Sequence, residues 1–450
     1  MDDGRNLIVT FALVSSLFFL WGVCNGMIDV MDKHFQEELN LSKSQSAWVQ
    51  FAHYLGYFLM SMPAGILASK FGYKWGIIAG LLMVAAGGFW FLPATHINSL
   101  AHAGLLSPTT AFVGYLAGVC AIAAGLTFLE TVANPYTTVL GPTEFAATRI
   151  NLAQSCNGVG WIFGPIIGGM FFYSKDAAGR STGNETLYIP YVIVAVVVLV
   201  LAVMFYFAYI PDIKTEDDYH LDDASPEVSH SIWAHPHFVM AVAAQFFYVA
   251  AQAGIFSFFI NYMTAETPPI PASWNSGMMS GWFEAGKSGA LALSNKGAAY
   301  LASLGFFCFL IGRFTGAGLL KKFSAHKMLG LYALINVLVC LLIVLKLGWF
   351  SVVCVFLSYF FMSIMFPTIF ALGIFGLGAR AKKASAYIVM AIMGGAILPK
   401  LMGYVADQYN MSRGFIVPLF CFAFVAFYGF SWPKLSQAEG LHDVKAAGGH

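Results

Sequence analysis

The sequence predicts an all-α membrane protein whose twelve transmembrane helices form two six-helix bundles. Hydrophobic residues make up 59% of the 450-residue chain and charged residues only 10%, whereas a soluble domain carries about 25% charged residues. Twelve mostly apolar runs are each long enough to cross a hydrocarbon core of about 30 Å. The surface is therefore expected to face lipid. A net charge of +1, without a basic cluster interleaved with aromatics, argues against a nucleic-acid partner.

The spans follow one another along the chain, and the first is too long for a signal-peptide apolar region, so it is expected to be retained. The predicted spans are residues 7–31, 45–67, 74–95, 109–136, 148–173, 188–210, 236–263, 297–319, 327–346, 349–374, 385–406 and 413–432. The seven cysteines lie in or beside these runs without a CxxC pair, which predicts packing residues and neither disulfides nor metal ligands.

Two long connections organise the chain. Residues 211–235 are rich in Asp and Glu, which is typical of a solvated linker. They divide the chain into an N-terminal bundle, residues 1–210, and a C-terminal bundle, residues 236–450. The other connection, residues 264–296, is rich in Gly, Ser and Pro and contains Trp274 and Trp282. Two interpretations stay open for this external loop: it folds over the mouth of the protein, or it is disordered.

The two halves resemble each other in sequence. Residues 65–74 resemble residues 318–327 with a one-residue slip, and residues 134–141 align without a gap with residues 366–373. Internal repeats of this kind are typical of transporters that bind substrate between their halves. The pattern resembles the major-facilitator architecture.

Positive charge predicts the orientation, because Lys and Arg are retained on the cytoplasmic side. Fourteen Lys and Arg residues lie in the two termini and in the loops predicted on the same side of the membrane as the termini. Eight lie in the loops on the opposite side. Both termini and the acidic linker are therefore expected in the cytoplasm.

Four ionisable residues lie inside predicted spans: Asp29, His53, Glu130 and Lys400. A charge at the bilayer centre costs at least about 2.5 kcal/mol, so each is a functional candidate. Glu130 aligns with Met362 in the second half, which argues that its carboxylate is not a packing requirement of the fold. Desolvation favours the neutral carboxyl, so Glu130 is expected to bind and release a proton. The alternative is a structural carboxylate held by neighbouring hydroxyl or amide groups.

Asp29 lies about one helical turn beyond Asn25 on the same face. It is the second expected proton-coupling carboxylate, unless it sits in water at the external end of its helix. Lys400 follows Pro399 and either contacts substrate or a carboxylate, or extends along its aliphatic stem to an interface. For His53 a proton-relay role is weaker than the alternative of a core histidine with both ring nitrogens satisfied.

Uncharged amides surround these carboxylates and suit the hydroxyls of a sugar. Trp21 and Phe256 could stack on the apolar face of a sugar ring, although ordinary packing is the commoner role of an aromatic in a span. Polar side chains also join helices in lipid, and that alternative stays open for each amide. The candidate amides are Asn25, Asn134, Gln154, Asn157, Gln245 and Gln252.

The chain resembles the fucose:proton symporter family of the major facilitator superfamily, which includes fucose permeases and glucose/galactose transporters. The resemblance covers nearly the whole chain and is carried by the motifs at residues 18–21, 129–142, 151–154, 244–252, 311–316 and 361–364. It implies a cavity between two bundles, alternating access, coupling by Asp29 and Glu130, and a polar lining that includes Gln154 and Asn157. The chain departs from the fucose-type pattern at Met365 and Phe366, at Phe256 and at Asn261, so fucose itself is not implied.

The expected function is a monosaccharide (hexose-type):proton symporter in the cell inner membrane, working as a monomer with no cofactor beyond its coupling ion. A sodium-coupled sugar symporter is the close alternative, because carboxylates with nearby carbonyls can also hold that ion. Drug efflux and an intramembrane sensor are weaker alternatives. Protease, hydrolase and P-loop motifs are missing from the sequence, which argues against an enzyme.

Overall fold

The computed structural model describes residues 2–139, 146–174, 182–208, 232–274, 281–285, 290–320, 322–375, 377 and 381–436. Within these ranges twelve helices are long and apolar enough to cross a membrane. The prediction of an all-α membrane protein with twelve spans is therefore confirmed. Most of the predicted linker, residues 211–235, lies outside the described residues.

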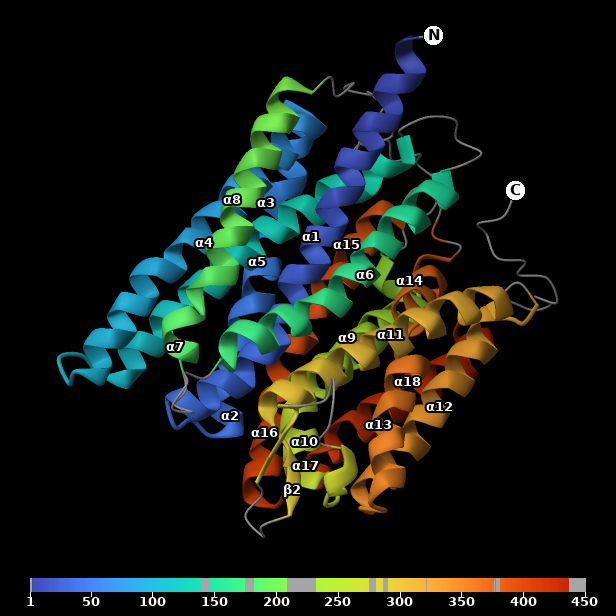
Figure 1. Cartoon of the computed structure of the whole chain (residues 1–450). Coiled ribbons are helices and arrows are strands. Elements are labelled where there is room, and N and C mark those ends of the chain that lie inside the picture. Colours follow the sequence, from blue (N-terminus) through green and yellow to red (C-terminus); the bar gives the residue numbers. More distant parts are fainter. Residues whose placement is uncertain are drawn as a thin grey trace.

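The first half of the chain forms the upper-left bundle in Figure 1, from blue to green. Its helices are α1 (Asp2–Glu38), α2 (Lys43–Ser46), α3 (Trp48–Phe71), α4 (Tyr73–His102), α5 (Pro108–Val139), α6 (Ala146–Phe172), α7 (Gly183–Thr186) and α8 (Tyr188–Phe207).

The second half forms the lower-right bundle, from yellow to red (Figure 1). Its elements are η2 (Ile232–Ala234), α9 (Pro236–Ser257), α10 (Phe259–Glu266), η3 (Ala272–Trp274), β1 (Phe283–Ala285), β2 (Leu291–Leu293), α11 (Asn295–Leu320), α12 (Ala325–Val344), α13 (Trp349–Met362), α14 (Met365–Ile374), α15 (Ala381–Met390), η6 (Ala391–Met393), α16 (Gly394–Gln408), α17 (Met411–Gly414) and α18 (Ile416–Leu435).

Four helical segments of the second half are interrupted. The chain breaks between α9 and α10 at Phe258, between α13 and α14 at residues 363–364, at η6 before α16, and between α17 and α18 at Phe415. Pro367 explains the second break in part, because a proline cannot donate the helical hydrogen bond to the carbonyl four residues earlier, at Ser363. Interrupted spans are common in transporters where irregular backbone lines a path through the protein.

Glycines bring α1 and α6 into direct backbone contact. Gly22 and Gly26 lie one turn apart on α1 and face Gly160 and Gly164 on α6. A Cβ at Gly26 would lie 2.9 Å from the Trp161 carbonyl oxygen, and one at Gly160 would lie 2.8 Å from the Val23 nitrogen. Small residues at such spacing allow close packing of helices in lipid, where dispersion contacts drive association.

The two halves contact each other in a symmetric way. Helix α6 of the first half packs against α11, and α3 packs against α16. In order of spans these are the fifth with the eighth and the second with the eleventh, so each contact is the repeat counterpart of the other. This pattern is what a parallel repeat about a central axis requires.

Polar contacts join the halves at one end of the molecule, which we call the closed end. The Asp407 carboxylate accepts hydrogen bonds from the backbone nitrogens of Lys43 at 3.0 Å and Ser44 at 2.9 Å. The Lys43 ammonium lies 3.4 Å from the same carboxylate, and Asn295 donates to Glu37. The closed end is at the bottom of Figure 1, where α2, α16 and α17 lie together, and the N-terminus is at the opposite end of the molecule.

The connection of residues 264–296 is structured in its described part. Strands β1 and β2 pair antiparallel, and Ile270 makes an isolated bridge with Leu291. Trp282 packs on Tyr300 with ring centroids 5.4 Å apart, and Trp274 packs on Trp349 at 5.7 Å. For these residues the disordered interpretation is wrong, and the hairpin lies at the closed end beside α10 and α16 (Figure 1).

Candidate functional site

Three helices of the first half bring the predicted residues together. Trp21, Asn25 and Asp29 lie one turn apart along α1, so they share one face of that helix. Helix α3 supplies Tyr54 and Tyr57, and α5 supplies Glu130. Both α3 and α5 pack against α1.

Tyr57 is the centre of this cluster. Its hydroxyl accepts a hydrogen bond from Trp21 Nε1 at 2.6 Å, Asn25 lies beside it, and Glu130 lies within electrostatic range of it. One turn earlier on α3, Tyr54 lies within electrostatic range of Asp29, Glu130 and Tyr248 of α9. The structure therefore joins predicted residues that are more than one hundred positions apart in sequence. We call Trp21, Asn25, Tyr54, Tyr57 and Glu130 the central polar cluster.

Glu130 lies deep in α5 and yet is partly exposed. Its side chain has no salt-bridge partner in the described part of the chain. Proton exchange at Glu130 stays a prediction, and so does the alternative of a structural carboxylate held by hydroxyl or amide groups. Asn134 lies one turn further along α5, and its side chain is outside the described residues.

Asp29 is buried, with 8% of its surface exposed. Gln50 Nε2 of α3 donates to Asp29 Oδ1 at 2.9 Å, while Oδ2 has no hydrogen-bond partner among the described residues. The alternative that Asp29 sits in water at the end of its helix is wrong for this state, because α1 continues for nine residues to Glu38.

The two candidates on α6 have different surroundings. The Asn157 side-chain amide donates to the Phe18 carbonyl oxygen at 3.1 Å, next to the glycines that join α1 and α6. In this state Asn157 therefore fastens two helices, as the packing alternative expects. Gln154, one turn earlier, is half-buried.

The candidates on α9 are less accessible. Gln245 is fully buried, and the described residues offer its amide no hydrogen-bond partner, whereas Gln252 is half-buried. Phe256 is buried among aromatic rings, including Trp161 at 5.8 Å and Tyr359 at 4.6 Å between centroids. These rings cover Phe256, so in this state it packs between helices and is not open for stacking on a sugar.

Lys400 lies apart from the central polar cluster. Its side chain is exposed, and its Nζ lies 3.8 Å from the centroid of the Trp48 ring, a cation–π contact that joins the halves near the closed end. This geometry favours the interfacial interpretation of Lys400. A substrate contact stays a prediction that no observation supports.

His53 is buried between the rings of Tyr54 and Tyr57. Its Nδ1 has no hydrogen-bond partner among the described residues. The interpretation of a core histidine with both ring nitrogens satisfied is therefore not met in this state.

Several polar residues of the site are not indicated by the sequence. Asp32 is fully buried, one turn beyond Asp29, but the predicted first span ended at residue 31. Arg313 is one of the fourteen positive residues that the charge count assigns to the cytoplasmic side, but it lies inside α11 with its guanidinium 5.1 Å from the Phe309 ring. Gln50, Tyr54 and Tyr57 carry ordinary polar or aromatic side chains, and only their helical spacing on α3 could have indicated them.

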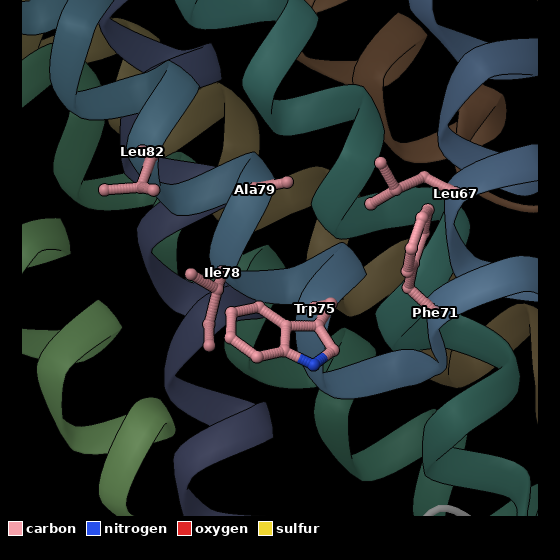
Figure 2. Close-up of a pocket in the computed structure, with 6 residues that line it drawn as sticks. All are labelled: Leu67, Phe71, Trp75, Ile78, Ala79 and Leu82. Atoms are coloured by element: carbon pink, nitrogen blue, oxygen red, sulfur yellow. The ribbon is translucent and has the colours of Figure 1, made fainter.

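An apolar groove between α3 and α4 is shown in Figure 2. It is lined by Leu67, Phe71, Trp75, Ile78, Ala79 and Leu82. Trp75 and Leu82 are each half-exposed although apolar, which suits a face turned to lipid and not a sugar path.

Known proteins similar to this chain were found at the level of both sequence and structure. Residues 9–283 match the family model of the Major Facilitator Superfamily. The chain is 34% identical to the L-fucose-proton symporter of Escherichia coli over 94% of this chain and 93% of that protein. It is 31% identical to a glucose/galactose transporter of Brucella abortus over 93% of each.

Among solved structures, the crystal structure of the transporter FucP in the outward conformation matches with a TM-score of 0.64 at 34% identity. The match covers 95% of this chain and 99% of FucP.

Proposed function

Because the chain belongs to the Major Facilitator Superfamily, we propose that it is a secondary active transporter that carries a monosaccharide together with a proton by alternating access. The relatives named above are fucose-proton and glucose/galactose transporters, and no enzyme is among them. The substrate class proposed is therefore a hexose-type monosaccharide. The chain is a multi-pass membrane protein, and a monomeric state with both termini in the cytoplasm of a bacterial inner membrane is part of the proposal.

The single observation that carries this proposal is the polar cluster around Tyr57, in which Trp21 donates to the Tyr57 hydroxyl, Asn25 lies beside it and Glu130 lies within electrostatic range. An indole, an amide and a phenol offer a sugar one apolar face and several hydrogen-bonding groups. Glu130 beside them allows proton binding and sugar binding to influence each other. Asp29 is the second proposed coupling carboxylate, held by Gln50.

With the termini in the cytoplasm, the closed end faces the outside. The state described is then closed outside, and the sugar would leave toward the cytoplasm after the proton-loaded transporter has closed over it. Lys43, Asp407, Glu37 and Asn295 would separate when the transporter opens outward.

Uptake of radiolabelled monosaccharides into proteoliposomes tests the proposal. A pH gradient, acid outside, is expected to drive accumulation in sodium-free buffer. Accumulation that requires a sodium gradient instead would replace the proton with sodium, and lipophilic cations transported in place of sugars would overturn the substrate class. A panel of hexoses, including fucose, glucose and galactose, would identify the substrate.

A further inference from the structure

A second buried carboxylate lies between the two halves and takes no part in the function proposed above. Asp32 is on α1, three residues beyond Asp29 and therefore on nearly the same face. It is fully buried, and neither of its carboxylate oxygens has a hydrogen-bond partner among the described residues.

Among the described residues, the groups that face Asp32 are polar or acidic, and none of them carries a positive charge. Asp29 lies close enough on the same helix to repel a second negative charge. Gln50 faces Asp32 from α3 but donates its amide to Asp29, and Tyr173, just after α6, donates its hydroxyl to the Val30 carbonyl oxygen.

The charged residues nearby are engaged elsewhere. Lys33 pairs with Glu37 at 3.1 Å, Lys43 with Asp407 at 3.4 Å, and Lys346 with Glu266 at 2.9 Å. His34 packs against the rings of Phe172 and Tyr173. The described part of the chain therefore holds no salt-bridge partner for Asp32.

An independent observation comes from the other half. Ser257, the last residue of α9, is fully buried, its hydroxyl has no hydrogen-bond partner among the described residues, and it faces Asp32. A protonated Asp32 would be both donor and acceptor, and the Ser257 hydroxyl can complement either role. Two unsatisfied polar groups, one from each half, thus face each other where the halves meet.

We propose that Asp32 is a proton-binding site that is loaded when the closed end forms, with Ser257 of the opposite half as its hydrogen-bonding partner. An ionised carboxylate without a donor or counter-charge is strongly disfavoured in a buried site, whereas the neutral acid is tolerated. When the halves separate, Asp32 reaches water and can release the proton. Closing this end therefore takes up one proton, independently of Glu130. For its place in a transport cycle the proposal rests on the proposed function.

The occupant is a proton and not sodium, because a proton needs one acceptor and a sodium ion needs several oxygens. Gln50 already uses its amide on Asp29. The Gln50 side chain therefore presents an N–H donor to the carboxylates, and an N–H group cannot coordinate a cation.

Distances between spin labels test the proposal without sugar or a proton gradient, so its failure can be told from failure of the proposed function. Leu105, after α4, and Leu347, after α12, are exposed residues, one in each half, on loops at the closed end. Cysteine substitutions there carry the labels, and the purified full-length transporter is measured from acid to alkaline pH.

In the otherwise unchanged protein the short distance should gain population as the pH falls. The ratio of closed to open molecules should rise by up to about tenfold per pH unit while one proton binds. Asp32→Asn should remain mostly closed at all pH values. Asp29→Asn should keep a pH dependence, and Ser257→Ala should lower the closed population at every pH.

Infrared spectroscopy gives a second measurement that does not depend on the labels. Closing should add the carbonyl band of a protonated carboxylic acid, and Asp32→Asn should weaken that band while the Glu130→Gln variant keeps it. An Asp32→Asn protein with an unchanged pH profile and an unchanged band would overturn the proposal. Closing that follows sodium concentration at fixed pH would overturn it as well.

Discussion

At the scale of single residues, the sequence indicated which side chains are ionisable in the membrane, but it did not indicate which side chains contact one another. Asp29 and Glu130 stood out because charged residues are rare in apolar spans. The Tyr57 hydroxyl did not, because only the fold brings Trp21 and Glu130 to it. Asp32 was missed for another physical reason. The polar run at residues 32–34 resembles the end of a span, but neighbouring helices bury it.

Glu130→Gln should abolish accumulation of sugar under a pH gradient while leaving sugar exchange across the membrane intact. Glutamine resembles the protonated acid, so the binding state is kept, but it cannot release a proton. Counterflow and net uptake measured on the same proteoliposomes separate the two activities. Accumulation equal to that of the unchanged protein would remove Glu130 from the coupling mechanism.

Tyr57→Phe should weaken sugar binding by about fivefold, since the loss of one neutral hydrogen bond costs about 1 kcal/mol. The change removes the acceptor of the Trp21 indole and leaves the ring in place. Calorimetric titration with the transported sugar measures the effect. Tyr404→Phe, on an exposed position of α16, is the matched control, and equal affinities in both variants would contradict a role of Tyr57 in the site.

At the scale of helices, the positions of the spans could be predicted closely, but their interruptions could not. The tenth span was predicted as residues 349–374, and the structure has Trp349–Ile374 as a membrane span that contains a break. Hydropathy reports the mean polarity of a window and is insensitive to a short change in backbone geometry. Hydropathy also does not indicate close contacts between helices, because a glycine in a membrane span can face either a neighbouring helix or open space.

Gly160→Ala tests the contact between α1 and α6. A methyl group there would crowd the Val23 nitrogen at 2.8 Å and the Gly22 Cα at 2.9 Å, both of them backbone atoms that cannot turn aside. Overpacking of this kind costs about 1–3 kcal/mol, so the melting temperature should fall by several degrees.

Gly65→Ala is the control for that experiment. Gly65 also lies inside a helix, α3, but a Cβ there would meet nothing within 4 Å. Alanine should leave the melting temperature unchanged or raise it slightly, because alanine favours a helix over glycine. An equal fall of the melting temperature in both variants would mean that crowding at the contact between α1 and α6 is not the cause of the destabilisation.

At the scale of the whole molecule, the internal repeat predicted two bundles, and the paired contacts of α6 with α11 and of α3 with α16 fit that repeat. Which end is closed could not be predicted, because both states of an alternating-access transporter have the same sequence. The closed state is held by contacts such as those of Asp407 with the start of α2, and a transporter in its other state lacks them without any change of sequence.

Joining the closed end covalently should stop transport. Cysteines in place of Lys43 and Asp407, whose side chains meet in the closed state, should form a disulfide on mild oxidation. Sugar uptake should then be lost and should return with a reducing agent. Each single cysteine variant is a control for the substitutions themselves, and full uptake by the oxidised double variant would show that this end does not need to open.

Two of the contacts at Asp407 have a consequence for variation among related sequences. The carboxylate is held by the main-chain nitrogens of Lys43 and Ser44 as well as by the lysine ammonium. Every residue except proline supplies a main-chain N–H donor, so substitutions at position 43 keep this hydrogen bond. Substitutions at position 407 remove the carboxylate that accepts it. The two halves are thus expected to evolve at different rates at the very place where they touch.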